Sequence, residues 1–338
     1  SRPIYEAGHC HLVANEWIFE LGGEQSQLAQ AELTELLTAA NCELAVTELN
    51  ELRLCCILAR PPPPRLLTRL GMVRNGGELA ATGSLEELET AVAAINLDGA
   101  HFAVRCASGV LELQEVNKRL GAILVKHGRV DLEQPAIIVR VFQGEKLQLL
   151  LEREATGYSH CLEHHLNRRP RFAPVSLPPR LARAMVNLAL PSGAGKLLDP
   201  FCGTGGLLIE AVDCELEASG SDLDREMIDA TRENLLHFDL TATLEQGDAA
   251  AMVQQIRPAA IATDPPYGRS ASTGHEPLDT LLARFSAACA EALPIGGRLV
   301  LTLPDPALLP QAGFRELYHY EWYVHGSLTR HLLVLEKT

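Results

Sequence analysis

The chain has 338 residues, of which 47% are hydrophobic and 21% are charged, so it can form two or three domains with cores of their own. It has no apolar run of about eighteen residues and no basic-then-apolar N-terminal pattern, which disfavours membrane insertion and secretion. Its nine cysteines lack regular spacing, which predicts reduced thiols in the cytoplasm. The net charge of −14 disfavours nucleic-acid binding unless basic residues gather on one face.

The first predicted unit is a small β-α-β-β region over residues 1–61. A strand is expected near 17–23 and a helix over 25–40, where apolar residues recur at helical spacing. Two further strand-like runs follow, at 42–49 and 52–58. Four prolines at 61–64 cannot continue a helix or a central strand, so they indicate a boundary.

Residues 62–152 form a second small α+β region. Helices are predicted over 84–94, where Ser84 and Glu87 can make a capping box, and over 111–127. Strand-like runs alternate with them, at 102–106, 135–142 and 147–154. The segment offers no nucleophile, metal quartet or phosphate loop, so we expect a binding module here.

Residues 153–177 have the composition of a linker, with several prolines and a basic cluster. Between residues 153 and 183 there are six arginines and two glutamates, a local surplus of positive charge. An acidic protein with such a belt can still hold RNA on one face. The candidate RNA-binding residues are Arg168, Arg169 and Arg171. The alternative is that these arginines make ordinary salt bridges with the acidic majority.

Two short clusters of cysteine and histidine, at 8–11 and 159–165, raise the question of a metal site. Structural zinc sites generally combine two ligand pairs, and neither cluster has a second Cys-x-x-Cys pair. We therefore expect surface polar residues and no metal.

From residue 178 to the end, strands and helices alternate. A helix with proline in its first turn is predicted over 178–190, and four strand-like runs then each lead to an acid. These acids are Asp199, Asp222, Asp248 and Asp264. A helix over 277–293, a buried strand over 298–303 and an antiparallel hairpin over 314–337 complete the pattern. Open α/β sheets bind ligands at the carboxyl ends of their parallel strands, so we expect a site there.

A glycine-rich turn follows the first acid, in the sequence DPFCGTGG from Asp199. Gly203 and Gly205 allow a ligand to approach the backbone at a helix N-terminus. The turn lacks the lysine and hydroxyl residue of a nucleoside triphosphate loop, and Leu208 replaces the third glycine of an NAD fingerprint. The carboxylate of Asp199 suits a ligand with a positive amino group, such as S-adenosylmethionine.

The next two acids suit the nucleoside part of such a ligand. Asp222 lies about twenty residues beyond the turn, where a carboxylate can accept from ribose hydroxyls. Asp248 would meet an adenine amino group. Asp224, by contrast, is expected to cap the helix that begins at Arg225.

The most specific signal is the tetrad Asp264-Pro265-Pro266-Tyr267. Two prolines stiffen the turn, so the Asp264 carboxylate and the Pro265 carbonyl can both accept from one planar amino group. Tyr267 can stack on the ring that carries this group. We therefore assign the tetrad to recognition of a planar amine.

The tetrad resembles the (Asn/Asp/Ser)-Pro-Pro-(Tyr/Phe) motif of S-adenosylmethionine-dependent amino-methyltransferases, and DPFCGTGG resembles their cofactor loop. The whole chain resembles the THUMP-containing RNA methyltransferases, and RLARAMVNLA, LLDPFCGTGGLLIEA and DPPYGRS are most similar to the archaeal and eukaryotic tRNA guanine-10 N2-methyltransferases. The match is specific over 178–270 and architectural over 16–152.

This resemblance implies a class I, Rossmann-like methyltransferase domain over 178–338, with a seven-stranded sheet that ends in an antiparallel hairpin. It also implies a ferredoxin-like region over 1–61 and a THUMP domain over 62–152 that holds tRNA. The implied catalytic residues are Asp264, Pro265, Pro266 and Tyr267. The implied cofactor-binding residues are Asp199, Phe201, Gly203, Thr204, Gly205, Asp222, Leu223, Asp248 and Ala249.

Several readings stay open at this point. A protein-glutamine or DNA-adenine methyltransferase shares the tetrad, but neither explains about 150 preceding residues of α+β structure. An enzyme for another tRNA or ribosomal RNA guanine would look almost the same, and a non-catalytic RNA-binding scaffold is the alternative of a different class. The sequence also allows either one or two methyl transfers, and either an enzyme that acts alone or one that needs a small activating subunit, as some relatives do.

Overall fold

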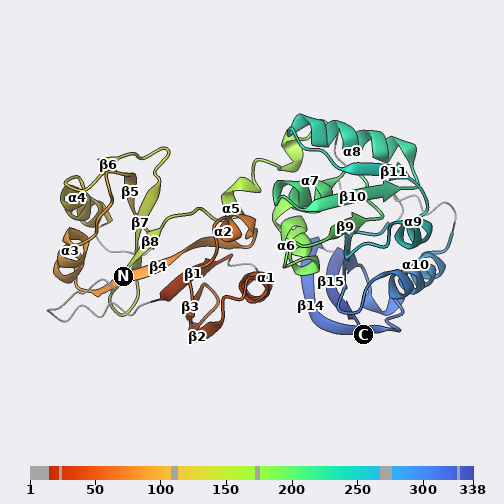
Figure 1. Cartoon of the computed structure of the whole chain (residues 1–338), viewed down its shortest axis with the longest axis horizontal. Helices are drawn as coiled ribbons and strands as arrows, with labels where there is room; N and C mark the ends of the chain where they lie inside the picture. The colour runs from red at the N-terminus through yellow and green to blue at the C-terminus, as the bar shows by residue number, and fades with distance from the viewer. Residues whose placement is uncertain (1–14, 23–24, 108–112, 172–175, 267–275, 326–327) are drawn as a thin grey trace. The chain divides into compact units, whose positions relative to one another are not determined.

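The computed structural model describes residues 15–22, 25–107, 113–171, 176–266, 276–325 and 328–338 (Figure 1). They form two compact units. The first contains the described parts of Ser1–Gly23, Asn41–Leu67 and Val73–Thr156, and the second those of Glu24–Ala40, Thr68–Met72 and Gly157–Thr338. Within the described residues, no helix has the length and apolar character needed to cross a membrane.

The first unit is built on one eight-stranded sheet, in the order β2-β3-β1-β4-β8-β7-β5-β6. Its strands are β1 (Glu16–Leu21), β2 (Leu44–Leu49), β3 (Arg53–Leu58), β4 (Val73–Gly83), β5 (His101–Cys106), β6 (Arg129–Val130), β7 (Ile137–Gln143) and β8 (Leu147–Glu152). Its main helices are α3 (Leu85–Ala93) and α4 (Leu113–Leu124). Leu88 and Val92 of α3 pack with Leu120 of α4 against Phe102 and Val139 of the sheet.

The predicted capping box is confirmed, since Ser84 and Glu87 exchange side chain-to-backbone hydrogen bonds at the start of α3. Strand β4 was not predicted, because its glycines are unfavourable in strands. The packing accounts for one of them, since a Cβ at Gly76 would lie 2.5 Å from the Phe19 ring. A second glycine follows it, and its Cβ would approach the Leu151 carbonyl oxygen to 2.8 Å.

The compact units divide the chain differently from the predicted domain boundaries. Strand β1, which precedes the tetraproline in the chain, pairs with β4, which follows it, so strands of both predicted N-terminal domains share one sheet. Helix α1 (Ser26–Ala39), expected in the first domain, belongs to the second unit. The short helix α2 (Leu66–Arg69) lies where the division falls.

The second unit has the predicted seven-stranded sheet, in the order β11-β10-β9-β12-β13-β15-β14. Its strands are β9 (Lys196–Asp199), β10 (Glu217–Asp222), β11 (Thr243–Gln246), β12 (Ala260–Thr263), β13 (Arg298–Leu303), β14 (Phe314–His325) and β15 (Leu328–Lys337). The five strands from β9 to β13 are parallel, and β14 and β15 form the antiparallel hairpin. The predicted fold of this part is therefore confirmed.

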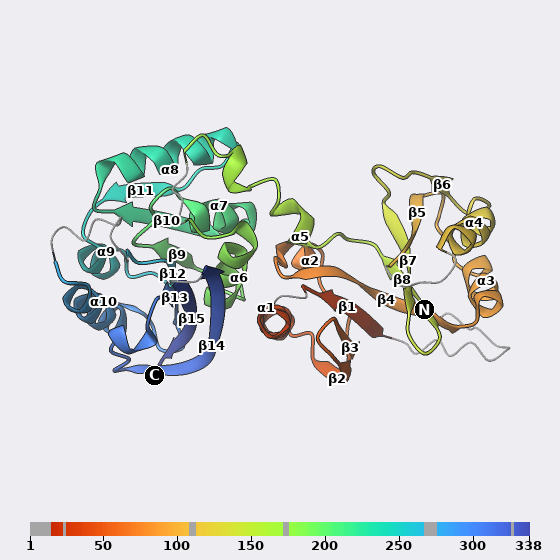
Figure 2. The same cartoon turned by 180° about the vertical axis from the view of Figure 1, so that it is seen from behind.

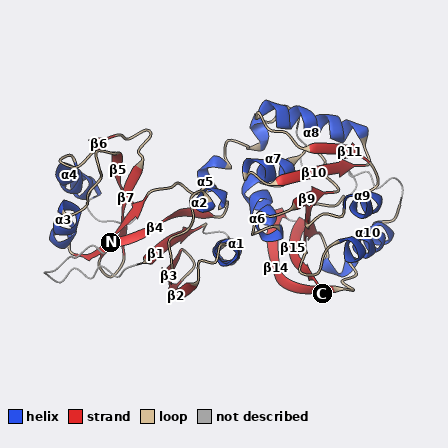
Figure 3. Ribbon diagram, viewed as in Figure 1, coloured by secondary structure: helices blue, strands red, loops and turns tan. Residues whose placement is uncertain are grey.

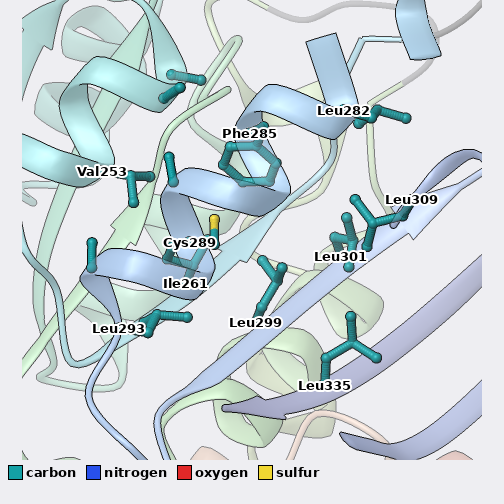
Figure 4. Packing of buried hydrophobic residues seen from close by; sticks show 14 of the residues in the cluster. Val253, Ile261, Leu282, Phe285, Cys289, Leu293, Leu299, Leu301, Leu309 and Leu335 are labelled. Atoms are coloured by element: carbon teal, nitrogen blue, oxygen red, sulfur yellow. The ribbon is translucent and has the colours of Figure 1, made fainter. Parts of the chain in front are cut away.

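Helices cover both faces of this sheet, as Figure 3 shows by colour and Figure 2 shows from behind. The helices are α6 (Pro179–Ala189), α7 (Gly206–Asp213), α8 (Arg225–His237), α9 (Ala249–Ile256) and α10 (Leu278–Ala292). The linker contains the short helix α5 (Gly157–His160) and the 3-10 turn η1 (Leu166–Arg168). A second 3-10 turn, η2 (Pro306–Leu308), follows β13. Leu282, Phe285 and Cys289 of α10 pack with Val253 of α9 against Leu299 and its neighbours on the strands (Figure 4).

Helix α1 is fixed to the second unit by a buried carboxylate, that of Glu32. It accepts from the Gly71 and Met72 amides at 2.9 and 2.8 Å and from Asn187 Nδ2 of α6 at 2.7 Å. Burial raises the pKa of Glu32, and these three donors oppose that effect. A sequence segment from before the tetraproline is therefore part of the second unit.

Candidate functional site

The four predicted acids follow neighbouring parallel strands and so come to one edge of the second sheet. Asp199 ends β9, Asp222 ends β10, Asp248 follows β11 and Asp264 follows β12. The strand order β11-β10-β9-β12 makes these strands adjacent. The strand-like runs that lead to these acids in the sequence predict this arrangement.

Asp199 is buried beneath the glycine turn. Its Oδ1 accepts from Thr263 Oγ1 at 2.7 Å and from the Phe201 amide at 3.3 Å, which joins the ends of β9 and β12. Burial, reinforced by the charges of Asp222 and Asp264, raises the pKa of Asp199 to about 7. A cationic ligand beside it would restore the ionised form.

The glycine turn has the backbone that its sequence predicts. Gly203 and Gly205 have φ of 51° and 85°, which favours glycine, and Gly205 is the N-cap of α7. A Cβ at Gly205 would meet the Thr231 side chain at 2.8 Å, whereas a Cβ at Gly203 would meet no atom within 4 Å. Phe201 packs edge to face on Phe285, at 5.2 Å between ring centroids. The turn is thus packed below Gly205 and open at Gly203.

Asp222 holds the open part of this turn. Its Oδ2 accepts from the Gly203 amide at 3.0 Å and its Oδ1 from the Asp224 amide at 2.9 Å. Burial raises its pKa. Leu223 beside it, at the end of the strand, leaves 51% of its surface exposed. Asp224 caps α8, as predicted.

The remaining predicted cofactor residues differ in accessibility. Thr204 is buried, and its carbonyl accepts from Asn234 Nδ2 at 2.8 Å. Ala249 is buried in the first turn of α9, which Asp248 caps. Arg284 of α10 donates to both oxygens of Asp248, at 2.6 and 2.8 Å, and lowers its pKa. Arg284 was not predicted from the sequence, because it is 36 residues away from Asp248 in the chain.

Among the side chains that contact Asp264 are Thr302 and Arg330, which were not predicted from the sequence. Thr302 Oγ1 at the end of β13 donates to Asp264 Oδ1 at 2.5 Å, and Arg330 Nη2 of β15 lies 3.6 Å from Asp264 Oδ2. Pro265 is buried and Pro266 is partly buried. Tyr267 lies outside the described residues. A charged residue in the strand-like run LTRHLLVLEK was the only sequence signal for Arg330.

The structure does not bring the three predicted RNA-binding arginines to the surface together. Arg168 is exposed, and Arg171 pairs with Glu226 and Glu233 at 2.9 and 3.6 Å. Arg169 is only 4% exposed and donates from Nε to the His164 carbonyl, and burial lowers its pKa. The prediction of a solvent-facing belt is therefore wrong for Arg169, because its side chain is enclosed by the protein.

The second cysteine and histidine cluster is part of a polar network on α7, whereas the cluster at 8–11 lies outside the described residues. His160, His164 and Asp213 offer ligand atoms within 4.8 Å of one another, a spacing that could hold a metal ion. The same Asp213 accepts from Arg183, which also binds Glu210 at 2.7 Å. The expectation of surface residues is wrong for Cys161 and His164, which are only 1% and 4% exposed, and the ring nitrogens of His160 and His164 lie 3.1 and 3.0 Å from carboxylate oxygens of Asp213 and Glu210.

Comparisons with known proteins agree with this site. A family model described as "RMKL-like, methyltransferase domain" matches residues 167–317. The tRNA (guanine(10)-N2)-dimethyltransferase of Methanothermobacter thermautotrophicus is 31% identical over 334 residues, which cover 95% of this chain and 99% of the relative. The enzyme of the same name from Pyrococcus abyssi is 30% identical over 94% of this chain and 98% of its own length.

Among solved structures, TrmN from Thermus thermophilus has a TM-score of 0.53 and 26% identity. The similarity covers 96% of this chain and 100% of that chain. It therefore extends over both compact units and not only over the sheet that carries the four acids.

Proposed function

We propose that this chain, which belongs to the tRNA (guanine(10)-N2)-dimethyltransferase family, transfers methyl groups from S-adenosylmethionine to the exocyclic N2 amine of a tRNA guanine. The observation that carries the proposal is the agreement along 99% of the length of a curated relative. Guanine 10 is the proposed target, with one or two methyl groups added. Guanine 10 is preferred because the two relatives that match over 95% and 94% of this chain are named for it, whereas the tRNA (guanine(6)-N2)-methyltransferase of Thermus thermophilus, 32% identical, matches over 66%.

The residues at the strand ends fit S-adenosylmethionine. Asp199 suits the positive amino group of the methionine portion, and the open side of Gly203 allows a ligand close to the backbone. Asp222 would accept from the ribose, and exposed Leu223 would cover one face of the adenine. Asp248 would have to share its carboxylate between Arg284 and the adenine amine. When bound, this cofactor supplies a methyl group on a positively charged sulfur.

The chain's own contribution to the chemistry is to orient the target amine. The lone pair of this nitrogen is delocalised into the guanine ring, which makes it a weak nucleophile. Hydrogen bonds from the amine to the Asp264 carboxylate and the Pro265 carbonyl would favour a pyramidal nitrogen with a directed lone pair. Fixed orientation and preorganised charge can each lower a barrier by several kcal/mol. Tyr267 would receive the base once it has left its stack.

Binding of tRNA is assigned to the N-terminal half and the linker. We propose a ferredoxin-like region over 1–61, a THUMP domain over 62–152 and a linker over 153–177, with Arg168 and Arg171 on the RNA path. The described cysteines form no disulfide, which suits a reducing cytoplasm. A requirement for a small activating subunit is not part of the proposal.

The test is transfer of tritium from methyl-labelled cofactor to bulk tRNA by the full chain. Asp264→Ala is expected to abolish transfer while calorimetry shows nearly intact cofactor affinity. Asp279→Ala removes an exposed acid at the start of α10 and is the matched control, with unchanged transfer. Loss of cofactor affinity in Asp264→Ala would count against the assigned role, and a wild-type chain that labels no tRNA would overturn the proposed function.

A further inference from the structure

Arg330 reaches the predicted active site because of the direction of its strand. Strand β15 is antiparallel to β13, and its register places His331 opposite Leu303 and Leu332 opposite Thr302. The start of β15 therefore lies at the sheet edge where the parallel strands end. This is the edge that carries Asp264.

The Arg330 side chain is buried and faces a carboxylate. Only 3% of it is exposed, and Nη2 lies 3.6 Å from Asp264 Oδ2. Thr302, fully buried on the strand between them, donates to the other oxygen of the same carboxylate. Burying a charged guanidinium costs free energy unless a negative charge lies beside it. Arg330 is buried in a strand of leucines and valine, and the Asp264 carboxylate supplies such a charge.

From these contacts we infer that Arg330 and Thr302 are positioning residues for methyl transfer, which hold the Asp264 carboxylate ionised and in one orientation toward the target amine. The inference rests on the proposed function of Asp264. An ionised carboxylate has about four acceptor positions, so it can accept from Thr302 and from an amine while it pairs with the charge of Arg330. A protonated carboxyl group would be a weaker hydrogen-bond acceptor for the amine. A carboxylate without the contacts to Thr302 and Arg330 would be free to rotate away from the amine.

Charged groups on two strands of the described structure act on Asp264. Arg330 of β15 favours the ionised form, whereas the neighbouring Asp199 of β9 opposes it, since the two carboxylates repel each other. A positive cofactor beside Asp199 would remove much of that repulsion. Measurements at saturating cofactor therefore isolate the effect of Arg330.

The first test compares Arg330→Met, Arg330→Lys and wild type in kcat against pH at saturating cofactor. Losing the buried positive charge that pairs with Asp264 should lower kcat about 10- to 100-fold at neutral pH and move the acid limb of the profile to higher pH. Arg330→Lys, which keeps the charge, should recover part of kcat and of the acid limb. The dissociation constant of the cofactor should change less than about twofold.

A matched control separates an effect on the orientation of Asp264 from a general effect on the stability of the fold. Arg298 at the other end of β13 is also largely buried, and it pairs with Glu35 at 2.7 Å. Arg298→Met should lower the melting temperature without moving the pH profile. If Arg330→Met folds and leaves both kcat and the acid limb unchanged, or if Arg298→Met moves that limb as far, the inference is overturned.

Two further measurements keep the inference testable. If Arg330→Met does not fold, Thr302→Val removes the second contact at nearly constant volume, and Thr302→Ser should restore activity. A carbon-13 NMR titration of the Asp264 carboxyl, assigned with Asp264→Asn, needs no substrate and should show protonation at higher pH in an Arg330 variant. It therefore decides the Arg330 contact even if the wild-type chain proves inactive on tRNA, and identical titrations would refute it.

Discussion

The buried carboxyl of Asp199 should make the protein less stable at neutral pH than an amide at the same position would. Burial raises its pKa from 3.8 to about 7, so between these values the folded protein holds a proton that the unfolded chain has released. Stability therefore falls as the pH rises through this window. At roughly 1.4 kcal/mol for each pH unit, the gap corresponds to about 4 kcal/mol at most.

Asp199→Asn tests this reasoning. Asparagine keeps an oxygen that can accept from Thr263 and the Phe201 amide, but it never ionises. The free energy of unfolding, measured with urea in the absence of cofactor, should be similar for both proteins near pH 4. At pH 8 the variant should be more stable by about 2–4 kcal/mol. Other groups with a raised pKa, such as Asp222 and Glu32, are present in both proteins and largely cancel in the comparison.

The same variant should lose function while it gains stability. The carboxylate is proposed to hold the positive amino group of the cofactor, so calorimetry should show at least about tenfold weaker cofactor binding in Asp199→Asn. A variant that is equally destabilised at pH 4 and pH 8 would refute the account of the buried charge. Unchanged cofactor affinity would remove Asp199 from the proposed site.

Three further predictions concern the scaffold and the RNA path. Glu32→Ala leaves three buried donors without their acceptor and should destabilise the chain by about 3 kcal/mol in urea unfolding, with Glu32→Gln clearly milder; equal losses would contradict the network. Gly205→Ala should lower the melting temperature and weaken cofactor binding, because φ is 85° and the new Cβ would approach Thr231; wild-type values for both would refute it. Arg168→Ala should weaken tRNA binding and reduce its salt slope by about one, whereas an unchanged slope takes Arg168 off the RNA path.

The strands, helices and glycine turn of the second unit could be predicted from the sequence because its local sequence patterns agree with the fold. Four of the five parallel strands, β9 to β12, are short runs that lead to an acid, and the turn at Gly203 and Gly205 is encoded by residues that tolerate positive φ. The hairpin at the C-terminus likewise follows from strand-like runs on either side of a short turn. These features depend on neighbouring residues, which a sequence displays directly.

The missed features depend on contacts between distant residues. Strand β4 looks unlike a strand until Phe19 is seen packing on Gly76. The burial of Arg169 and the pairing of Arg330 with Asp264 are set by tertiary structure, and nothing near either arginine in the chain indicates it. Helix α1 was predicted as an element, but its place in the second unit follows from the buried acceptor Glu32.

The central claim is that the chain methylates the N2 amine of guanine 10 in tRNA, and mass spectrometry of tRNA nucleosides tests it most directly. An unmodified tRNA transcript is incubated with the full chain and S-adenosylmethionine, digested and mapped, beside a transcript in which guanine 10 is replaced by adenine. We predict N2-methylguanosine or N2,N2-dimethylguanosine at position 10, and none in the replaced transcript. Methylation of another atom, or of another position in both transcripts, would contradict the claim.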